Sequence, residues 1–456
     1  MGAEFLEALR AALPGLRVLT EAGEVEAYRY DETEYLHPGV PLGVVFPGST
    51  ADVAAIVRLA AAHAVPLVPR GAGTGLSGGA TGVQGALTVV MTGMAAILEI
   101  DQANLVAVVQ PGVINADLGR AAAAVGLFYA PDPASYETCT IGGNLAEDSG
   151  GLRCLKYGVT RDAVLGLEVV MADGTVIRTG GKTIKDVAGY DLTQLFIGSE
   201  GTLGIITEAT LRLHPAPPPK LTLLAFFDSV HDAGRAVAGI TAAGLVPVTL
   251  ELMDRFTIRA VDAAMRVGLP EDAGAMLMIE SDAGVAAPDE LDRAESACRA
   301  AGATETARAA DPTEADWLRE ARRKAHWSLE QAGVARMDDV GVPRSRVPEL
   351  LDAIEAISAE ARLPVGVFGH AGDGNLHPTF VVDRDDPTAE ARINAARARI
   401  YEAALALGGT ITGEHGTGVA KRAWLEAQRG PDAVRVMRAV KAALDPLGIL
   451  NPGKVL

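Results

Sequence analysis

The sequence PRGAGTGLSGG at residues 69–79 continues the apolar run VPLVP and decides the fold of the first part of the chain. Gly73, Gly75 and Gly78 have the spacing of a Rossmann dinucleotide fingerprint, and GLSGG at 75–79 has the spacing of a nucleophile elbow. Both motifs need a helix to begin at the loop, whereas the next residues, ATGVQGALTVV, add glycines and then a strand pattern. We therefore reject both motifs. The glycines still allow backbone N–H groups to line a concavity for phosphate oxygens; a tight surface loop without a ligand is the alternative.

Short β-rich runs and glycine-rich turns surround this loop, and one helical pattern, DVAAIVRLAAAHA, precedes it. The β-rich runs are GVVFP, VPLVP, ALTVVM, LVAVV, VLGLEVVMADG and TVIRTG, and Asp173-Gly174 is a hairpin-turn signal. The region closes at His214, and the proline run PAPPP at 215–219 predicts a stiff linker. We expect an α+β domain over residues 38–215, preceded by a helical segment at 1–37.

After the linker the pattern changes to a second mixture of strands and helices. KLTLLAFF, VPVTLELMD and AMLMIESD predict strands, and SVHDAGRAVAGITAAG predicts a helix. We expect an αβ domain over residues 216–385. The remaining residues, 386–456, contain the helical pattern TAEARINAARARIYEAALALGG, the loop TITGEHGTG and a proline-glycine tail, and we expect a C-terminal helical segment there.

The composition excludes several classes of partner. The 456 residues carry a formal charge of −18, and such an acidic surface repels nucleic acid and anionic membranes. Three cysteines, Cys139, Cys154 and Cys298, are too few for a disulfide framework and fit a reducing compartment. The sequence contains no apolar run of about 18 residues that predicts a transmembrane segment, and its amphipathic N-terminus differs from a signal peptide. We expect a cytoplasmic protein; the oligomeric state stays open.

The strongest chemical signal is HAGDGNLH at residues 370–377. A two-residue hairpin turn at Asp373-Gly374 would pair His370 directly with His377, so that both imidazoles lie on one face of the hairpin. Directly paired positions have Cβ atoms about 4.5–5.5 Å apart, a span that one metal ion bridges. The motif therefore predicts two metal ligands.

A third ligand is offered by GEHGTG at residues 413–418, where Glu414 stands next to His415. Neighbouring side chains diverge, so Glu414 can face a metal ion while His415 faces elsewhere. Two histidines and one carboxylate leave coordination positions open for a substrate and suit Zn²⁺, Mn²⁺ or Fe²⁺. The alternative is a set of ordinary polar loop residues, but the grouping of the two motifs favours a metal or catalytic site.

Glycine, proline and hydroxyl residues recur beside strands in PDP at 131–133, TIGGN at 140–144, SGG at 149–151, YG at 157–158 and GSEGTLG at 198–204. Together with the glycine loop, these segments resemble the FAD-binding domain of the vanillyl-alcohol oxidase superfamily. The resemblance runs from about residue 41 to the C-terminus. It implies a two-subdomain PCMH-type FAD-binding domain, followed by a ferredoxin-like cap domain that binds substrate.

The resemblance also implies how FAD is held. Some superfamily members tether the flavin through a histidine in or beside the glycine loop, but residues 69–80 contain no histidine. Neither Cys139 nor Cys154 falls where a tether is expected, so we expect noncovalent FAD. The expected FAD-binding residues are Pro69, Arg70, Gly71, Ala72, Gly73, Thr74, Gly75, Ser77, Gly78, Pro131, Thr140, Gly142, Gly143, Asn144, Ser149, Gly150, Gly151, Tyr157, Gly158, Glu200, Gly201, Gly204, Ile205 and Asn451.

The two histidine motifs are similar to the C-terminal part of the D-lactate, glycolate and D-2-hydroxyglutarate dehydrogenase group. This resemblance implies that His370, His377 and Glu414 bind a divalent metal and that His415 is the catalytic base. It also places Asn375 at the substrate.

A cation for a substrate carboxylate is expected in WLREARRKAHW at residues 317–327, which resembles a stretch of glycolate oxidase D subunits. We choose Arg323 over Lys324, because the planar guanidinium binds a carboxylate bidentately. A solvated helix face is the alternative for Arg323, because Arg319 and Arg322 lie so close to it in the sequence.

The implied activity is oxidation of a small D-2-hydroxy acid to the 2-oxo acid, with proton removal by His415 and hydride transfer to flavin N5. Some relatives carry a lysine for a second substrate carboxylate just before the VGVP segment at 340–343, where this chain has Met337 beside Arg336. D-lactate or glycolate is therefore favoured over D-2-hydroxyglutarate, which remains an alternative.

Other functions stay open alongside this one. The chain could be the catalytic flavin subunit of a multi-subunit glycolate oxidase, a metal-dependent hydroxylase without flavin, or a non-catalytic flavin-binding scaffold subunit. The electron acceptor is a quinone, a cytochrome, an electron-transfer flavoprotein, an iron–sulfur subunit or oxygen. An acceptor at the inner membrane would bring the protein there as a peripheral partner.

Overall fold

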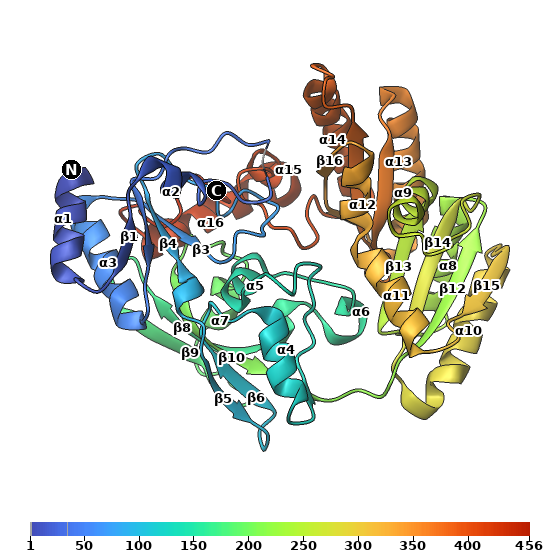
Figure 1. Ribbon diagram of the computed structural model, residues 1–456, viewed down its shortest axis with the longest axis horizontal. Helices are drawn as coiled ribbons and strands as arrows, with labels where there is room; N and C mark the ends of the chain where they lie inside the picture. Colours follow the sequence, from blue (N-terminus) through green and yellow to red (C-terminus); the bar gives the residue numbers. More distant parts are fainter. Residues whose placement is uncertain (1, 34) are drawn as a thin grey trace. The chain divides into compact units, whose positions relative to one another are not determined.

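The computed structural model describes residues 2–33 and 35–456 and divides into two compact units. The first unit comprises the residues up to 150, residues 158–216 and residues 414–456; the second comprises 151–157 and 217–413. Figure 1 traces the chain by colour. The sequence predicts a boundary after residue 385, but residues 386–413 belong to the second unit, because α14 (Ala389–Ala406) packs against α13 (Val347–Ala361).

The first sheet of the first unit contains, in spatial order, β1 (Arg17–Leu19), β2 (Gly43–Phe46), β4 (Leu87–Val90) and β3 (Leu67–Arg70). The last three are parallel, and β1 is antiparallel to β2. Helix α3 (Thr50–His63) connects β2 to β3, and α1 (Gly2–Ala12) packs on it. Residues 71–86, between β3 and β4, contain no helix, which confirms the rejection of a Rossmann motif. A short helix, α2 (Ala22–Glu26), follows β1.

The second sheet of this unit is antiparallel and contains, in order, β5 (Ile97–Asp101), β6 (Val106–Val109), β10 (Ile205–Arg212), β8 (Val164–Val170) and β9 (Val176–Gly180). The turn between β8 and β9 contains Gly174 at φ +78°, which confirms the predicted hairpin turn. The remaining elements are α4 (Asn115–Ala123), β7 (Leu127–Phe128), α5 (Ile141–Glu147), α7 (Leu192–Phe196), β11 (His214–Pro215), α15 (Leu425–Arg429) and α16 (Pro431–Leu444).

The second unit is built on one eight-stranded antiparallel sheet. Its order is β15 (Glu305–Arg308), β12 (Leu221–Phe227), β14 (Ala275–Ser281), β13 (Thr249–Asp254), β18 (Val365–His370), β19 (Asn375–Val382) and β16 (Val334–Met337), with β17 (Val340–Gly341) also paired to β19. The run β12, α8 (Val230–Ala242), β13, β14, α10 (Ala287–Ala300) and β15 has the β-α-β-β-α-β order of the expected ferredoxin-like motif, with one further helix, α9 (Arg255–Met265), inserted between β13 and β14.

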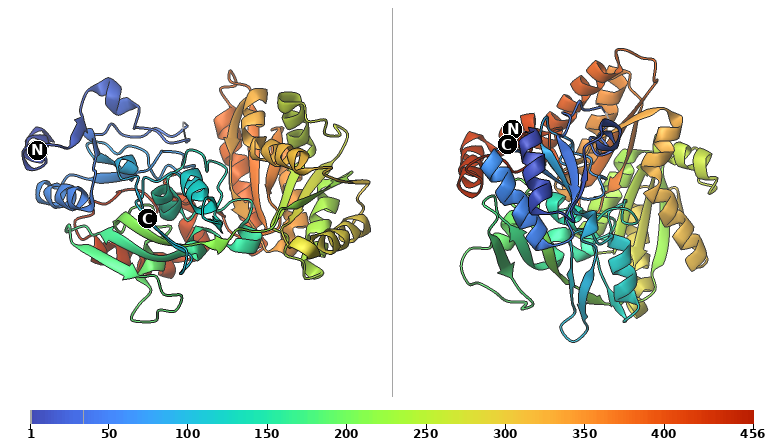
Figure 2. Two further views of the ribbon diagram at one scale, coloured as in Figure 1. Left: turned by 60° about the horizontal axis from the view of Figure 1, so that its bottom comes forward. Right: turned by 60° about the vertical axis from the view of Figure 1, so that its left-hand side comes forward.

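Helices cover both faces of this sheet (Figures 1 and 2). One group contains α8, α10, α13 and α14, and the other contains α9 (Arg255–Met265), α11 (Pro312–Arg323) and α12 (Ala325–Ala332). Because both faces are covered, β12 and β14 are almost unbroken apolar runs: Phe226 and Met278, for example, pack with Ile258 and Leu329 of the second group. The short helix α6 (Cys154–Tyr157) belongs to this unit. Within residues 2–33 and 35–456, helices long and apolar enough to span a membrane are absent.

Candidate active site

The first unit contains a cavity lined by the glycine loop, by α5 and by the turn that precedes β10. Most of the expected FAD-binding residues line it: Pro69, Arg70, Gly71, Ala72, Gly73, Thr74, Gly75, Thr140, Gly142, Gly143, Asn144, Ser149, Glu200, Gly201, Gly204 and Ile205. Cys139 and Glu147 also line the cavity, although the sequence did not single them out as FAD contacts.

Two glycines of the loop have no room for a side chain. A Cβ at Gly71 would lie 2.3 Å from Thr140 Oγ1, and a Cβ at Gly73, which has φ +84°, would lie 2.0 Å from Arg70 Nη2. Thr140 is itself held, because its hydroxyl caps α5 by accepting a hydrogen bond of 3.2 Å from Gly143 N–H. Larger residues at these two positions would therefore collide with side chains of the cavity wall.

Other expected FAD-binding residues do not line this cavity: Ser77, Gly78, Pro131, Gly150, Gly151, Tyr157, Gly158 and Asn451. Asn451 supports the cavity wall, because its Nδ2 donates hydrogen bonds of 2.9 Å to the carbonyl of Gly79 and 2.6 Å to that of Glu200. Tyr157 belongs to the second unit, where its hydroxyl donates a hydrogen bond of 2.6 Å to Asp282.

Two acidic side chains, Glu147 and Glu200, face the same glycine beside the cavity. A Cβ at Gly79 would lie 2.7 Å from Glu147 Oε1 and 2.9 Å from Glu200 Oε2. Burial raises the pKa of Glu147 well above its usual range, and the charge of Glu200 raises it further. Burial also raises the pKa of Glu200, although N–H groups of the 413–418 loop oppose this. The sequence missed Glu147, because nothing in IGGNLAEDSGG distinguishes it from a solvated acid.

Glu200 anchors the loop at 413–418. Its Oε1 accepts hydrogen bonds of 2.8 Å from Thr417 N–H and 2.9 Å from Gly418 N–H. Glu200 also has φ +51°, a left-handed conformation that is rare for residues other than glycine. A strained backbone conformation of this kind is typical of functional sites, and at Glu200 it occurs at the residue whose carboxylate holds this loop.

The C-terminus closes the same region. Lys454 Nζ donates hydrogen bonds of 2.6 Å to the Gly78 carbonyl and 3.1 Å to the Thr81 carbonyl. Burial lowers the pKa of Lys454 to about 8, although nearby acids such as Asp31 oppose this. Sequence analysis treated residues 445–456 as a tail and did not predict this contact.

The histidine hairpin of the second unit differs from the prediction in its register. The sequence predicts a two-residue turn, but the loop spans four residues, 371–374, and His370 pairs with Asn375 while His377 pairs with Phe368. The longer loop is stabilised from outside the hairpin, because Val342 N–H donates a hydrogen bond of 3.0 Å to the Gly374 carbonyl. The shift is two residues, so both histidines keep the same face. Their ring centroids are 5.2 Å apart.

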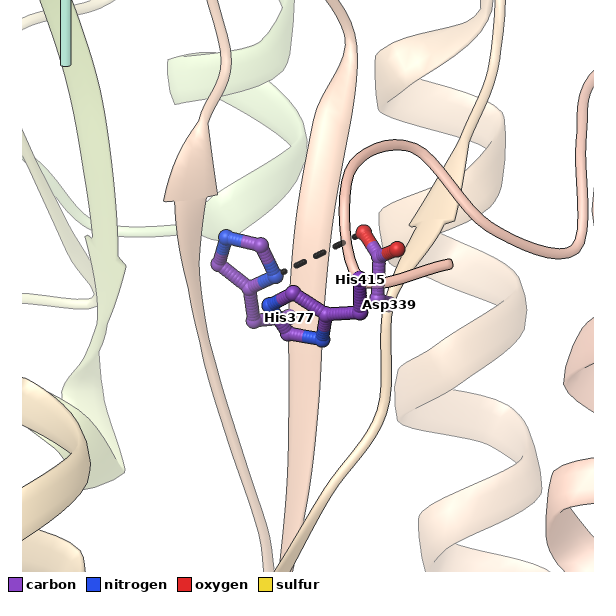
Figure 3. Close-up of side chains that lie close together, drawn as sticks. All are labelled: Asp339, His377 and His415. Atoms are coloured by element: carbon purple, nitrogen blue, oxygen red, sulfur yellow. Dashed lines mark ion pairs between the residues drawn. The ribbon is translucent and has the colours of Figure 1, made fainter. Parts of the chain in front are cut away.

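A buried carboxylate faces Nδ1 of each histidine. Glu251 Oε1 on β13 lies 2.8 Å from His370 Nδ1, and Asp339 Oδ1 lies 3.7 Å from His377 Nδ1, the ion pair drawn in Figure 3. Asp339 also accepts hydrogen bonds from Asn375 Nδ2 at 2.5 Å and from Gly413 N–H at 2.7 Å. The sequence missed both carboxylates. One ring nitrogen of His370 lies within 4.8 Å of one of His377, so the pair fits a shared metal ion.

The cations near residue 320 have different surroundings. Arg322 is buried and its Nη2 lies 2.5 Å from Glu251 Oε2, whereas Lys324 is exposed and lies 3.5 Å from Glu320. Arg323, the predicted substrate ligand, is half-buried at the end of α11. Asn375 is directed to Asp339 and to the Val340 carbonyl.

The buried Glu280 lies on β14 in the same unit. Arg319 Nη2 lies 2.6 Å from its Oε1, and Lys220 Nζ lies 3.1 Å from its Oε2. Burial alone would raise the pKa of Glu280, but these two cations outweigh it and lower the pKa to about 2. Arg319 is therefore part of a buried ion pair and is not a solvated side chain.

Two known domain families match most of the chain. Residues 41–180 match the FAD binding domain, and residues 216–455 match the C-terminal domain of FAD linked oxidases. The chain belongs to the FAD-linked oxidase family. It is an FAD-linked oxidoreductase, and the glycine loop, α5 and Glu147 all lie within the matched FAD binding domain.

Members of this family with assigned names cover nearly the whole chain. Glycolate oxidase subunit GlcD of Bacillus subtilis is 46% identical over 430 residues, which are 94% of this chain and 91% of that protein. GlcD of Escherichia coli (strain K12) is 41% identical over 98% of this chain and 90% of its own length. A D-lactate dehydrogenase of Archaeoglobus fulgidus is 36% identical over 94% of this chain and 96% of its own.

Solved structures of lower sequence identity share the fold of this chain. p-Cresol methylhydroxylase is 17% identical, with a TM-score of 0.83 over 99% of this chain and 96% of that protein. Alkyldihydroxyacetonephosphate synthase is 19% identical, with a TM-score of 0.74 over 98% of this chain and 85% of its own. These likenesses confirm the predicted fold. The lining of the cavity fits the FAD cofactor, because Gly71 and Gly73 leave the backbone open where a side chain would collide with Thr140 or Arg70.

Proposed function

We propose that the protein oxidises a small D-2-hydroxy monocarboxylic acid, D-lactate or glycolate, to the 2-oxo acid, with FAD and a divalent metal. The observation that carries this proposal is that relatives between 36% and 46% identical along almost the whole chain are named glycolate oxidase subunit and D-lactate dehydrogenase. The paired histidines of the hairpin support the metal.

The proposed metal ligands are His370, His377 and Glu414, for Zn²⁺, Mn²⁺ or Fe²⁺. Glu414 is the residue after Gly413, whose N–H is hydrogen-bonded to Asp339 close to His377. Chain connectivity thus supports the third ligand. A divalent ion supplies a Lewis acid that favours ionisation of the substrate hydroxyl.

His415 is the proposed base. Its role is to accept the hydroxyl proton of the substrate, and the Glu200 anchor of the following residues holds its loop. FAD supplies the acceptor for the Cα hydride that leaves as the proton is removed. We propose that FAD is noncovalent; Cys139 lines the cavity, but burial raises the pKa of its thiol and disfavours the reactive thiolate.

We propose that Arg323 binds the substrate carboxylate and that Lys324 and Asn375 also contact the substrate. Some relatives use a lysine just before the VGVP segment to bind a second substrate carboxylate, and this chain has Met337 at that position. There Met337 packs against the hydrophobic core, and Arg336 Nε lies 2.8 Å from Glu390 Oε1. These contacts support a monocarboxylate over D-2-hydroxyglutarate.

A second candidate is the same reaction within a multi-subunit complex. It is favoured by the word subunit in the names of the Bacillus subtilis and Escherichia coli relatives. The chain would then pass electrons to a partner subunit, for example an iron–sulfur protein; a quinone, a cytochrome or an electron-transfer flavoprotein would serve an independent enzyme.

Anaerobic flavin bleaching tests the proposal. The yellow holoprotein is mixed separately with D-lactate, L-lactate, glycolate and D-2-hydroxyglutarate, before and after treatment with EDTA. Bleaching by D-lactate or glycolate that EDTA prevents is the expected result. A yellow protein that none of the four acids reduces would overturn the substrate class, and bleaching that EDTA leaves unchanged would overturn the metal.

A further inference from the structure

Glu251 is buried in the second unit and joins two groups that the sequence treated separately. Its exposed fraction is 1%. One carboxylate oxygen lies 2.8 Å from His370 Nδ1, and the other lies 2.5 Å from Arg322 Nη2. Arg322 is held in turn, because its guanidinium carbon lies 4.9 Å from the centroid of the Phe368 ring.

These contacts determine the tautomer of His370. Arg322 occupies one oxygen of the Glu251 carboxylate, and the other oxygen faces Nδ1 of His370 as a hydrogen-bond acceptor. His370 Nδ1 must therefore be the donor. In a neutral imidazole with hydrogen on Nδ1, the lone pair is on Nε2.

We propose that Glu251 is a positioning residue that fixes His370 as an Nε2 metal ligand, an inference that rests on the proposed metal site. Ligating histidines usually donate their second ring N–H to a carboxylate or a carbonyl, which orients the ring and increases its basicity. Glu251 performs this function from β13, the neighbouring strand, and Arg322 holds the carboxylate in place from α11.

The chain offers a matched control in Glu280. Both acids are buried in the same sheet, and both pair with an arginine of α11, Glu251 with Arg322 and Glu280 with Arg319. The hydrogen bonds of Glu280 come from lysine, threonine and arginine side chains. Replacing either acid with glutamine removes a buried charge from an ion pair, but only the replacement of Glu251 alters a contact of His370.

The test measures Zn²⁺ binding by the full-length, FAD-loaded protein without turnover. EDTA-stripped wild type, Glu251→Gln, Glu280→Gln and His370→Ala are dialysed against buffered Zn²⁺, and bound zinc is measured by mass spectrometry. In Glu251→Gln, the new amide can accept from Nδ1–H only by turning its NH₂ group toward Arg322. We expect the Kd to rise about 10- to 100-fold in Glu251→Gln, binding to be lost in His370→Ala, and Glu280→Gln to keep the wild-type Kd.

The outcomes separate this inference from the proposed function. Wild type that binds no zinc overturns the metal site itself. Wild-type affinity in Glu251→Gln, with binding lost in His370→Ala, overturns only the role of Glu251, and so does an equal loss in Glu280→Gln. If Glu251→Gln fails to fold, the double variant Glu251→Leu/Arg322→Met removes both charges together, which buried pairs tolerate better, and the same rise in Kd is expected.

Discussion

Replacing Gly416 with alanine tests whether the buried acids Glu147 and Glu200 determine the position of the loop at residues 413–418. Gly416 follows His415 and has φ +86°. A Cβ there would lie 2.0 Å from Glu147 Oε2 and 3.1 Å from Glu200 Oε1. Neither acid can move freely, because Glu200 is bonded to the backbone of the same loop and Glu147 faces Gly79.

The expected cost has two parts. A left-handed backbone destabilises alanine by roughly 1–2 kcal/mol, and overlap in a packed interior adds roughly 1–3 kcal/mol. The structure relieves the overlap by moving the loop or the acids. Because the adjacent residue is His415, the proposed base, a displacement of about 1 Å there would lower the rate by about 100-fold.

The assay compares Gly416→Ala with Gly126→Ala. Gly126 has φ +76°, but a Cβ there meets nothing within 4 Å, so this variant carries the backbone strain alone. Both proteins are tested for FAD content, for thermal unfolding and for kcat with an artificial dye as acceptor. We expect Gly126→Ala to lose stability and keep kcat, and Gly416→Ala to lose about 100-fold in kcat while it retains FAD. Equal kcat values for the two variants would show that contact with Glu147 and Glu200 does not determine the position of His415.

Three further predictions concern other parts of the molecule. Glu280→Gln should be less stable than wild type at neutral pH, by about 3 kcal/mol, because the pKa of Glu280 is about 2 in the folded protein and 4.5 ordinarily. The difference in the free energy of unfolding is present above pH 4.5 and disappears toward pH 2. Chemical unfolding at several pH values measures it. Lys454→Met should weaken FAD binding about tenfold or more, because it removes charged hydrogen bonds to the carbonyls of Gly78 and Thr81. Flavin fluorescence measures the Kd for FAD. Lys185→Met, on an exposed segment, is the control. His415→Ala should abolish turnover and retain the metal, whereas His370→Ala should lose both, as metal analysis and flavin bleaching will determine.

The sequence predicts well those features that depend on neighbouring residues. The absence of a helix after the glycine loop follows from the glycines of residues 71–85, and the hairpin turn at Gly174 follows from its Asp-Gly pair. Both result from local backbone preferences, which need no knowledge of distant contacts.

The histidine hairpin shows a partial success. The common face of His370 and His377 was predicted correctly, because any register shift by two residues preserves the face. The register was wrong, because a hydrogen bond from Val342 to the hairpin loop favours four loop residues over the two that Asp373-Gly374 prefers. Likewise, α14 joins the second unit through its packing on α13, which its own helical pattern does not reveal.

The residues alone thus predicted the glycine loop and the two histidine motifs, and the family resemblance added the ferredoxin-like cap. The buried charges that support these features follow from the packing of the folded chain. Glu251 and His370 are 119 residues apart and meet because β13 pairs with β18. Glu200 and Gly418 are 218 residues apart and are joined by a hydrogen bond in the folded chain. The sequence does not distinguish a buried acidic residue from one on the surface, because the partner of that residue depends on strand order and packing.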